Sequence, residues 1–164
     1  MSPAHSIEAV LREHGPLLAR IAASYERDAA RREDLVQEIT LAVWRALDSW
    51  RGDASLRTFL ARVAHNRAID HVASQRRRGE ELLDEEHPDS GAEPAQHAEL
   101  QQRRDVLLRA VRALPLGQRQ VVVLALEGFS QVEIGQALAL EANTVAQRLS
   151  RARRLMREYM GATA

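Results

Sequence analysis

Apolar residues recur every three or four positions along most of the chain, which is the period of an amphipathic α-helix. Alternating β-branched runs are absent, and the chain has only two Trp, two Tyr and two Phe, so strands are not expected. The pattern therefore predicts an all-α fold. The predicted helices are 6–24, 31–48, 55–77, 97–113, 117–127, 131–139 and 143–159.

The helical pattern stops between positions 80 and 96, where acidic residues, two prolines and a glycine replace the apolar repeat. Such a composition favours a solvated linker over a packed element. Net charge changes at the same place: it is +3 over residues 1–79, −8 over 80–100 and +5 over 101–164, although the whole chain sums to zero. We therefore predict two small helical domains, 1–79 and 101–164, joined by a flexible acidic linker over 80–100. The linker is either a plain spacer or an acidic segment that mimics nucleic acid or keeps the basic domains off DNA.

The clearest helix start and stop signals lie between positions 114 and 145. Pro115 suits the first turn of a helix, and Gly128 follows an apolar run at a point where a left-handed cap is expected. Ser130 and Glu133 have the spacing of a capping box, in which each side chain satisfies a free amide at the helix start. A short helix, a tight turn and a longer helix then follow, which predicts a helix-turn-helix.

The last predicted helix separates apolar from cationic side chains. Its apolar stripe is Val145, Leu149, Ala152, Met156 and Tyr159. Gln147, Arg151 and Arg154 lie opposite this stripe, with further arginines on the flanks. Glutamine and arginine can bond the edges of adenine and guanine bidentately in the major groove. An arginine-rich face is often only solvated, but its position directly after a capped helix-turn-helix favours DNA contact.

The helix over 31–48 has two distinct sides. Its core face is Leu35, Val36, Ile39, Val43 and Leu47. The opposite side carries Gln37, Leu41 and Trp44, bordered by acids, a composition typical of a protein interface with a charged rim. The alternative is a central helix covered on both sides, with Trp44 under the first helix. Helical angles alone do not separate these two interpretations.

A loop with a glycine hinge, Trp50–Ser55, precedes the helix over 55–77. The apolar stripe of that helix continues into Asn66, Arg67 and Asp70, so its later half is expected to face water or a ligand. Three arginines, 76–78, end the helix, where cations also favour the helix dipole.

Several function classes are excluded by composition. The chain has no cysteine, which excludes disulfides, thiolate zinc sites and thiol catalysis. It has no apolar run long enough to span a bilayer and no signal-peptide core, so we expect a cytoplasmic protein without membrane insertion. The six histidines lack metal-ligand spacing, and His65 and His71 are expected on the surface. We expect no catalytic site, no metal and no cofactor.

Taken together, the two blocks resemble a known family. DLVQEITLAVWRAL and WRGDASLRTFLARVAHNRAID are similar to the second conserved region of bacterial RNA polymerase sigma factors of the extracytoplasmic-function (ECF) group of the sigma-70 family. LPLGQRQVVVLALEGFSQVEIGQALALEANTVAQRLSRAR is similar to the fourth region. These segments cover about 34–70 and 114–154 in the family's order, with no room for a third-region domain.

The resemblance implies a transcription initiation factor that binds core RNA polymerase, directs it to promoters and is controlled by an anti-sigma factor. The first domain would dock on the clamp of the polymerase's largest subunit through Asp34, Gln37, Glu38, Leu41 and Trp44. The Trp50–Arg57 loop, with Asn66 and Asp70, would hold bases flipped from the melted −10 element. The residues expected to bind the −10 DNA are Trp50, Arg51, Gly52, Asp53, Ser55, Arg57, Asn66, Asp70, Arg76 and Arg77. The second domain would sit on the polymerase flap and recognise the −35 element through Thr144, Gln147, Arg148, Ser150, Arg151 and Arg154.

The chain departs from the family's usual pattern at three places. Ala139 stands at a turn position that is usually glycine, and a left-handed alanine costs on the order of 1 kcal/mol. Glu141 stands where serine is a common cap, and Ala146-Gln147 replaces a basic residue followed by serine. The −35 sequence recognised is therefore expected to differ from common ones. The alternative function is a helix-turn-helix regulator that acts without being a polymerase subunit, but it leaves the Trp50–Ser55 loop unexplained.

Overall fold

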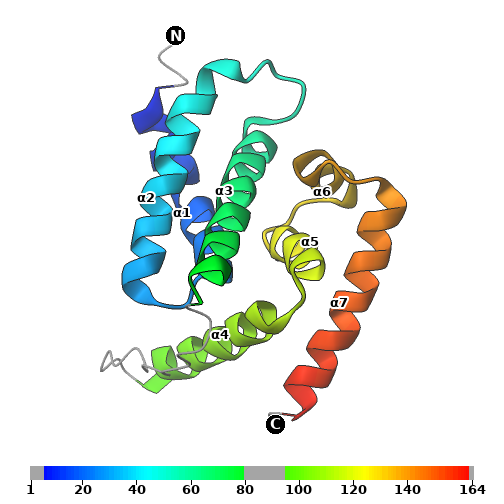
Figure 1. Cartoon of the computed structure of the whole chain (residues 1–164). Coiled ribbons are helices and arrows are strands. Elements are labelled where there is room, and N and C mark those ends of the chain that lie inside the picture. The colour runs from blue at the N-terminus through cyan, green and yellow to red at the C-terminus, as the bar shows by residue number, and fades with distance from the viewer. Residues whose placement is uncertain (1–5, 80–94, 163–164) are drawn as a thin grey trace.

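The computed structural model describes residues 6–79 and 95–162, which form seven α-helices, one short 3-10 helix and no strand (Figure 1). The all-α prediction is confirmed. No helix within these residues is long and apolar enough to cross a membrane.

The N-terminal block is a three-helix bundle. Its elements are α1 (Ile7–Tyr25), α2 (Ala29–Ala46), the 3-10 helix η2 (Leu47–Ser49) and α3 (Leu56–Arg78). Each α-helix begins at a side chain that accepts a hydrogen bond from an amide of its first turn: Ser6, Asp28 and Ser55. The predicted core face of α2 is largely confirmed, because Leu35, Ile39 and Val43 are fully buried against α1 and α3.

The C-terminal block contains α4 (Ala95–Ala113), α5 (Leu116–Leu126), α6 (Gln131–Leu138) and α7 (Ala142–Ala162). The last residues of the predicted linker, 95–100, belong to α4. The remainder, 80–94, lies outside the described residues.

Local signals place the turns of this block. Ser130 and Glu133 form both hydrogen bonds of the predicted capping box at the start of α6, and Gly128 has a left-handed backbone with φ +86°. Pro115 is the N-cap of α5 and not a residue of its first turn. Ala139 is left-handed, with φ 54° and ψ 48°, at the turn between α6 and α7. A strained alanine therefore stands where glycine would be relaxed.

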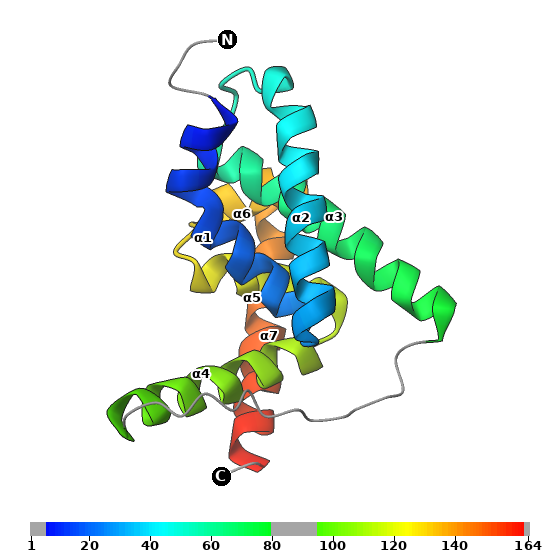
Figure 2. The same cartoon turned by 90° about the vertical axis from the view of Figure 1, so that its left-hand side faces the viewer.

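The two blocks pack directly on each other. Helix α6 lies against α3, and α4 crosses the end of α1 (Figures 1 and 2). Buried apolar side chains from both blocks belong to one cluster. Composition and charge did not predict this contact between the blocks.

Candidate functional site

The outer face of α2 is apolar and open to solvent. Trp44 is 58% exposed and Leu41 44% exposed, so the interpretation that places Trp44 under α1 is wrong. Both side chains line a hollow of about 380 Å³ together with Ile7, Val36, Gln37 and Thr40. The predicted polar neighbours Asp34, Gln37 and Glu38 are exposed on the same helix. All five predicted docking residues therefore share one accessible helix.

The loop before α3 is held by its own hydrogen bonds. Trp50 donates from Nε1 to the Ala54 carbonyl at 2.9 Å, which places the two ends of the loop side by side. Gly52 is left-handed, with φ +83°, and its neighbours Arg51 and Asp53 point outward as exposed side chains. The loop is thus a short, closed turn that presents a cation and an acid to solvent.

A second hollow, of about 400 Å³, opens between this loop and the first turns of α3. Its lining is polar and aromatic: Ser49, Trp50, Arg51, Asp53, Ala54, Thr58, Phe59, Arg62 and Gln136. All but the last come from the N-terminal block, whereas Gln136 comes from α6. The hollow is of the size that accommodates a small planar ligand.

Helix α3 has an exposed polar face beyond this hollow, as predicted. Asn66 and Asp70 are exposed, and Arg67 lies 3.6 Å from Glu38 of α2 and 3.9 Å from Asp70. Arg76 and Arg77 are exposed in its last turn.

The prediction that His65 and His71 lie on the surface is wrong. His65 is fully buried, and His71 is only partly exposed. The core face of α3 runs through Ala64, Ala68 and Val72, so the helix turns its histidines toward α1.

His65 shares a buried hydrogen bond with Tyr25 of α1, with 2.7 Å between the hydroxyl and Nδ1. Burial raises the pKa of Tyr25, and Arg119 of α5 opposes that rise. The hydroxyl is therefore the donor and neutral His65 the acceptor. Burial lowers the pKa of His65 to about 3, because a charged ring would lose its hydration there.

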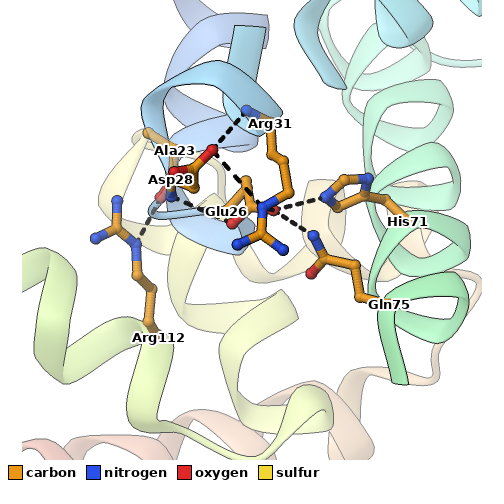
Figure 3. Close-up of polar contacts among 7 residues, drawn as sticks. All are labelled: Ala23, Glu26, Asp28, Arg31, His71, Gln75 and Arg112. Carbon is orange, nitrogen blue, oxygen red and sulfur yellow. Dashed lines mark hydrogen bonds and ion pairs between the residues drawn. The ribbon is translucent and has the colours of Figure 1, made fainter. Parts of the chain in front are cut away.

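Glu26, at the end of α1, is a buried carboxylate that joins three helices (Figure 3). It accepts hydrogen bonds from His71, at 3.0 Å, and from Gln75, both on α3, and it faces Arg31 of α2 at 3.7 Å. Burial raises the pKa of Glu26, but these hydrogen bonds, the Asp28 amide and the Arg31 charge outweigh burial and bring it below the ordinary value. The network joins the end of α1 and the start of α2 to the half of α3 that carries Arg76 and Arg77.

Helix α7 separates its faces as predicted. Val145, Leu149 and Ala152 are buried, and the later stripe residues are partly buried. Of the predicted DNA-contacting residues, Gln147, Ser150, Arg151 and Arg154 are exposed, whereas Thr144 and Arg148 are partly buried. Arg148 lies against α5, since a methyl group on Gly117 would be 3.4 Å from its Nη1.

The turn before α7 depends on a glycine that sequence reasoning did not single out. A Cβ at Gly135 would lie 2.8 Å from the Leu140 carbonyl oxygen, and the Leu140 amide donates to the Gly135 carbonyl at 3.0 Å. Only glycine permits this close approach of Leu140 to α6.

Comparison with known proteins identifies the two blocks. The Sigma-70 region 2 family model matches residues 10–78, and the Sigma-70 region 4 model matches residues 104–156. The ECF RNA polymerase sigma-E factor of Escherichia coli (strain K12) is 32% identical over 131 residues, which cover 73% of this chain and 69% of that relative. The chain belongs to the ECF group of RNA polymerase sigma factors. As a sigma factor it directs the polymerase to promoters.

Solved structures of sigma factors share the fold. CnrH, in complex with the cytosolic domain of CnrY, has a TM-score of 0.70 and 26% identity over 96% of this chain and 89% of its own. RpoE of Bartonella quintana, in complex with the anti-sigma factor NepR, has a TM-score of 0.68 and 25% identity over 94% and 96% of the two chains. Helices α1–α3 are therefore the region 2 domain, and α4–α7 contain region 4.

The sigma-factor fold brings most of the predicted residues onto three separate surfaces. Arg57 is the exception: its guanidinium lies 4.0 Å from the centre of the Phe129 ring and donates to the Glu127 carbonyl, both in the region 4 domain. Glu127 and Gln136 also border the predicted −10 surface and were not predicted. Within residues 6–79 and 95–162, no group of three or more histidine or carboxylate side chains is placed to hold a metal ion.

Proposed function

We propose that three surfaces divide the work of this sigma factor, and that the outer face of α2 binds the polymerase. The observation that carries the proposal is the exposed pair Leu41 and Trp44 beside an open apolar hollow. Asp34 and Glu38 supply a charged rim, and a large aromatic side chain inside such a rim is typical of a binding hot spot. From the family resemblance we infer that this face would contact the clamp of the largest polymerase subunit and that the region 4 domain would contact the polymerase flap.

The loop Trp50–Ser55 and the exposed face of α3 form the proposed −10 surface. The hollow beside Trp50 has the volume and the mixed polar and aromatic lining to receive a base that has left the stack. Asn66 and Asp70 extend the surface along α3, and Arg76 and Arg77 provide cations for the phosphates. Unpairing costs a few kcal/mol, which a pocket for an extruded base offsets.

The exposed face of α7 forms the proposed −35 surface. Gln147 and Arg151 are one helical turn apart, both exposed, and lie opposite the buried stripe. They can therefore enter the same major groove while α7 stays packed on α5. Arg154, one turn further on, lies 4.0 Å from Glu158 in an exposed pair that phosphate can displace.

An anti-sigma protein is the remaining proposed partner. RpoE of Bartonella quintana is in complex with the anti-sigma factor NepR, and CnrH is in complex with the cytosolic domain of CnrY. Both matches extend over more than nine tenths of this chain and include both of its domains. We therefore infer that a protein of this class holds the chain away from polymerase.

The docking face is tested by truncating Trp44. Trp44→Ala is expected to weaken binding to core polymerase by about 2 kcal/mol, or roughly 30-fold, because an interface aromatic is lost. Folding should change little, since the side chain is already 58% exposed. Leu100→Ala is the matched control, because Leu100 is 65% exposed on α4, away from α2. Fluorescence anisotropy of labelled sigma factor gives the affinity, and circular dichroism gives the folded fraction.

The result against the proposal is equally specific. If Trp44→Ala unfolds the region 2 domain while affinity per folded molecule stays unchanged, the side chain is structural and the docking face lies elsewhere. If Leu100→Ala weakens binding as much as Trp44→Ala, the loss does not report the α2 face.

Run-off transcription separates the sigma-factor function from the helix-turn-helix alternative. With core polymerase and a library of templates, the protein should produce promoter-specific transcripts, whose start sites reveal both elements. The isolated protein should bind the same duplexes weakly, since its cationic side chains are divided between two domains. Tight, sequence-specific binding by the isolated protein at physiological salt would support the alternative.

A further inference from the structure

The last turns of α3 extend beyond the region 2 bundle. Val72 is the last buried apolar side chain of this helix, and residues 73–78 are an alanine, a serine, a glutamine and three arginines. Figure 2 shows this end of α3 leading away from α1 and α2. Since packing of apolar side chains supplies most of the stability of a helix in a protein, the segment that carries Arg76 and Arg77 needs another anchor.

Two polar contacts provide that anchor. His71 and Gln75 lie one helical turn apart, on the face of α3 that is turned toward the end of α1 (Figure 3). Both contact the same oxygen of Glu26: His71 Nε2 lies 3.0 Å from Oε1, and the Gln75 side-chain amide donates to it. The side chain directly before Arg76 is therefore tied to the bundle.

The Glu26 carboxylate is itself held by the turn between α1 and α2. The Asp28 amide donates to Oε2 at 3.3 Å, and Arg31 Nε lies 3.7 Å from Oε1. Glu26 is only 5% exposed, and burial of a carboxylate is costly unless its oxygens are bonded. The carboxylate therefore stabilises its donors in place. The bundle contributes a fixed acceptor, and the projecting part of α3 contributes two donors.

We propose that Glu26 is a positioning residue for promoter DNA: through His71 and Gln75 it holds the end of α3, so that Arg76 and Arg77 reach the phosphates. The inference rests on the proposed −10 surface, in which these two arginines supply the cations. A helix end that is ordered before it meets DNA loses less conformational entropy on binding, which raises the affinity. Glu26 acts through α3, since it is too buried to touch DNA itself.

A double-mutant cycle separates positioning from general stability. Glu26→Ala is made in the unmodified chain and in an Arg76→Ala, Arg77→Ala background, and each holoenzyme is titrated with one promoter duplex selected by run-off transcription. In the unmodified chain we expect binding about three to ten times weaker, because the order of the helix end is lost. Without the two arginines we expect no further loss, since nothing remains to be positioned. Glu26→Gln keeps an acceptor oxygen for both donors and should retain most of the affinity.

Two further variants complete the set. Gln75→Ala removes one donor at a partly exposed position and leaves Glu26 bonded to His71, so this variant tests the proposal even if Glu26→Ala does not fold. It should weaken promoter binding in the same direction. Glu13→Ala is the matched control for affinity, because its carboxylate is 77% exposed on α1, and it should leave promoter binding unchanged.

A spin label measures the order of the helix end directly. The chain has no cysteine, so Arg78→Cys gives a unique attachment site in the last turn of α3. Without polymerase or DNA, nitroxide mobility at this site should increase in Glu26→Ala and Gln75→Ala. Glu127→Ala is the control for mobility: it removes a carboxylate near the start of α3 that accepts two hydrogen bonds of 2.8 Å from Arg20 of α1, and it should leave the label unchanged. Circular dichroism gives the folded fraction of each variant.

The proposal is overturned if folded Glu26→Ala or Gln75→Ala matches the unmodified chain in label mobility, or if mobility rises without any loss of promoter affinity. An equal loss of affinity with and without the two arginines also overturns it, because Glu26 would then act on the domain as a whole. If the Arg76→Ala, Arg77→Ala chain binds the promoter as tightly as the unmodified chain, the proposed phosphate contacts fail, and the positioning role fails with them. If that chain is impaired and Glu26→Ala is not, the −10 surface stands and only the role of Glu26 is wrong.

Discussion

Acidification should destabilise this protein already at pH values where the carboxylates are still charged. The destabilisation arises from His65. The ring is fully buried beside Tyr25, with a pKa of about 3 in the folded chain against about 6.5 for an exposed histidine. Between these two pKa values, His65 therefore binds a proton in the unfolded chain but not in the folded chain. The stabilisation is complete above pH 6.5 and is lost as the pH falls from 6.5 toward 3.

The size of the effect follows from the two pKa values. At pH 5 the ratio of protonated to neutral histidine in the unfolded chain is about 30 to 1, whereas His65 in the folded chain remains neutral. The free energy of unfolding should therefore fall by about 2 kcal/mol between pH 7.5 and pH 5. Glu26 adds a loss in the same direction only at lower pH, because its pKa lies below the ordinary value.

Urea unfolding followed by circular dichroism at half-unit steps from pH 7.5 to 5 measures this slope. The informative variant is His65→Asn, which keeps an acceptor near the Nδ1 position but cannot be protonated. It should be less stable overall, with a nearly flat profile between pH 6.5 and 5. His97→Asn is the control, since it makes the same replacement at an exposed histidine of α4. Parallel profiles for His65→Asn and the unmodified protein would refute the reasoning.

Two further predictions concern the DNA-binding surfaces. Ala139→Gly should raise the free energy of unfolding by about 1 kcal/mol, because the left-handed turn between α6 and α7 no longer holds a Cβ; an unchanged urea midpoint would contradict this. The Asn66→Ala variant should melt the −10 region poorly on duplex templates, and its transcription should improve on a template with a pre-melted bubble. The Gln147→Ala variant should lose about 1–3 kcal/mol of discrimination between −35 base pairs on both templates. Permanganate footprinting measures melting, and run-off transcription measures promoter use. Equal impairment of Asn66→Ala on both templates would contradict separate roles for the −10 and −35 surfaces.

Local physics explains what could be predicted from the sequence. Helix starts follow from caps such as Ser130, whose partner lies three residues away, and helix faces follow from a period that spans a few turns. The exposed Gln147 and Arg151 were predictable for the same reason, since α7 packs through one stripe. Trp44 was ambiguous, because the same spacing fits a helix covered on one side or on both.

The errors and omissions arise from contacts between distant parts of the chain. The spacing of His65 and His71, six positions apart and off one helical face, predicts surface residues, but Tyr25, forty residues before His65, provides a buried partner. Glu127 looks like an ordinary polar residue before a turn, and its role depends on Arg20, which is 107 positions away. Arg57 was predictable as part of the loop surface, but not its capture by Phe129. No local pattern contains such information.

The Arg20–Glu127 contact joins two parts of one polypeptide, and this determines how it responds to the amount of protein. A tethered partner is present at an effective concentration in the millimolar range for short flexible connections, whatever the concentration of the molecule itself. Dilution or overproduction of the sigma factor therefore leaves the occupancy of this contact unchanged. An inhibitor on a separate chain behaves differently, because it is exhausted once the sigma factor outnumbers it. A contact within the chain cannot be exhausted in this way, because each molecule carries both of its partners.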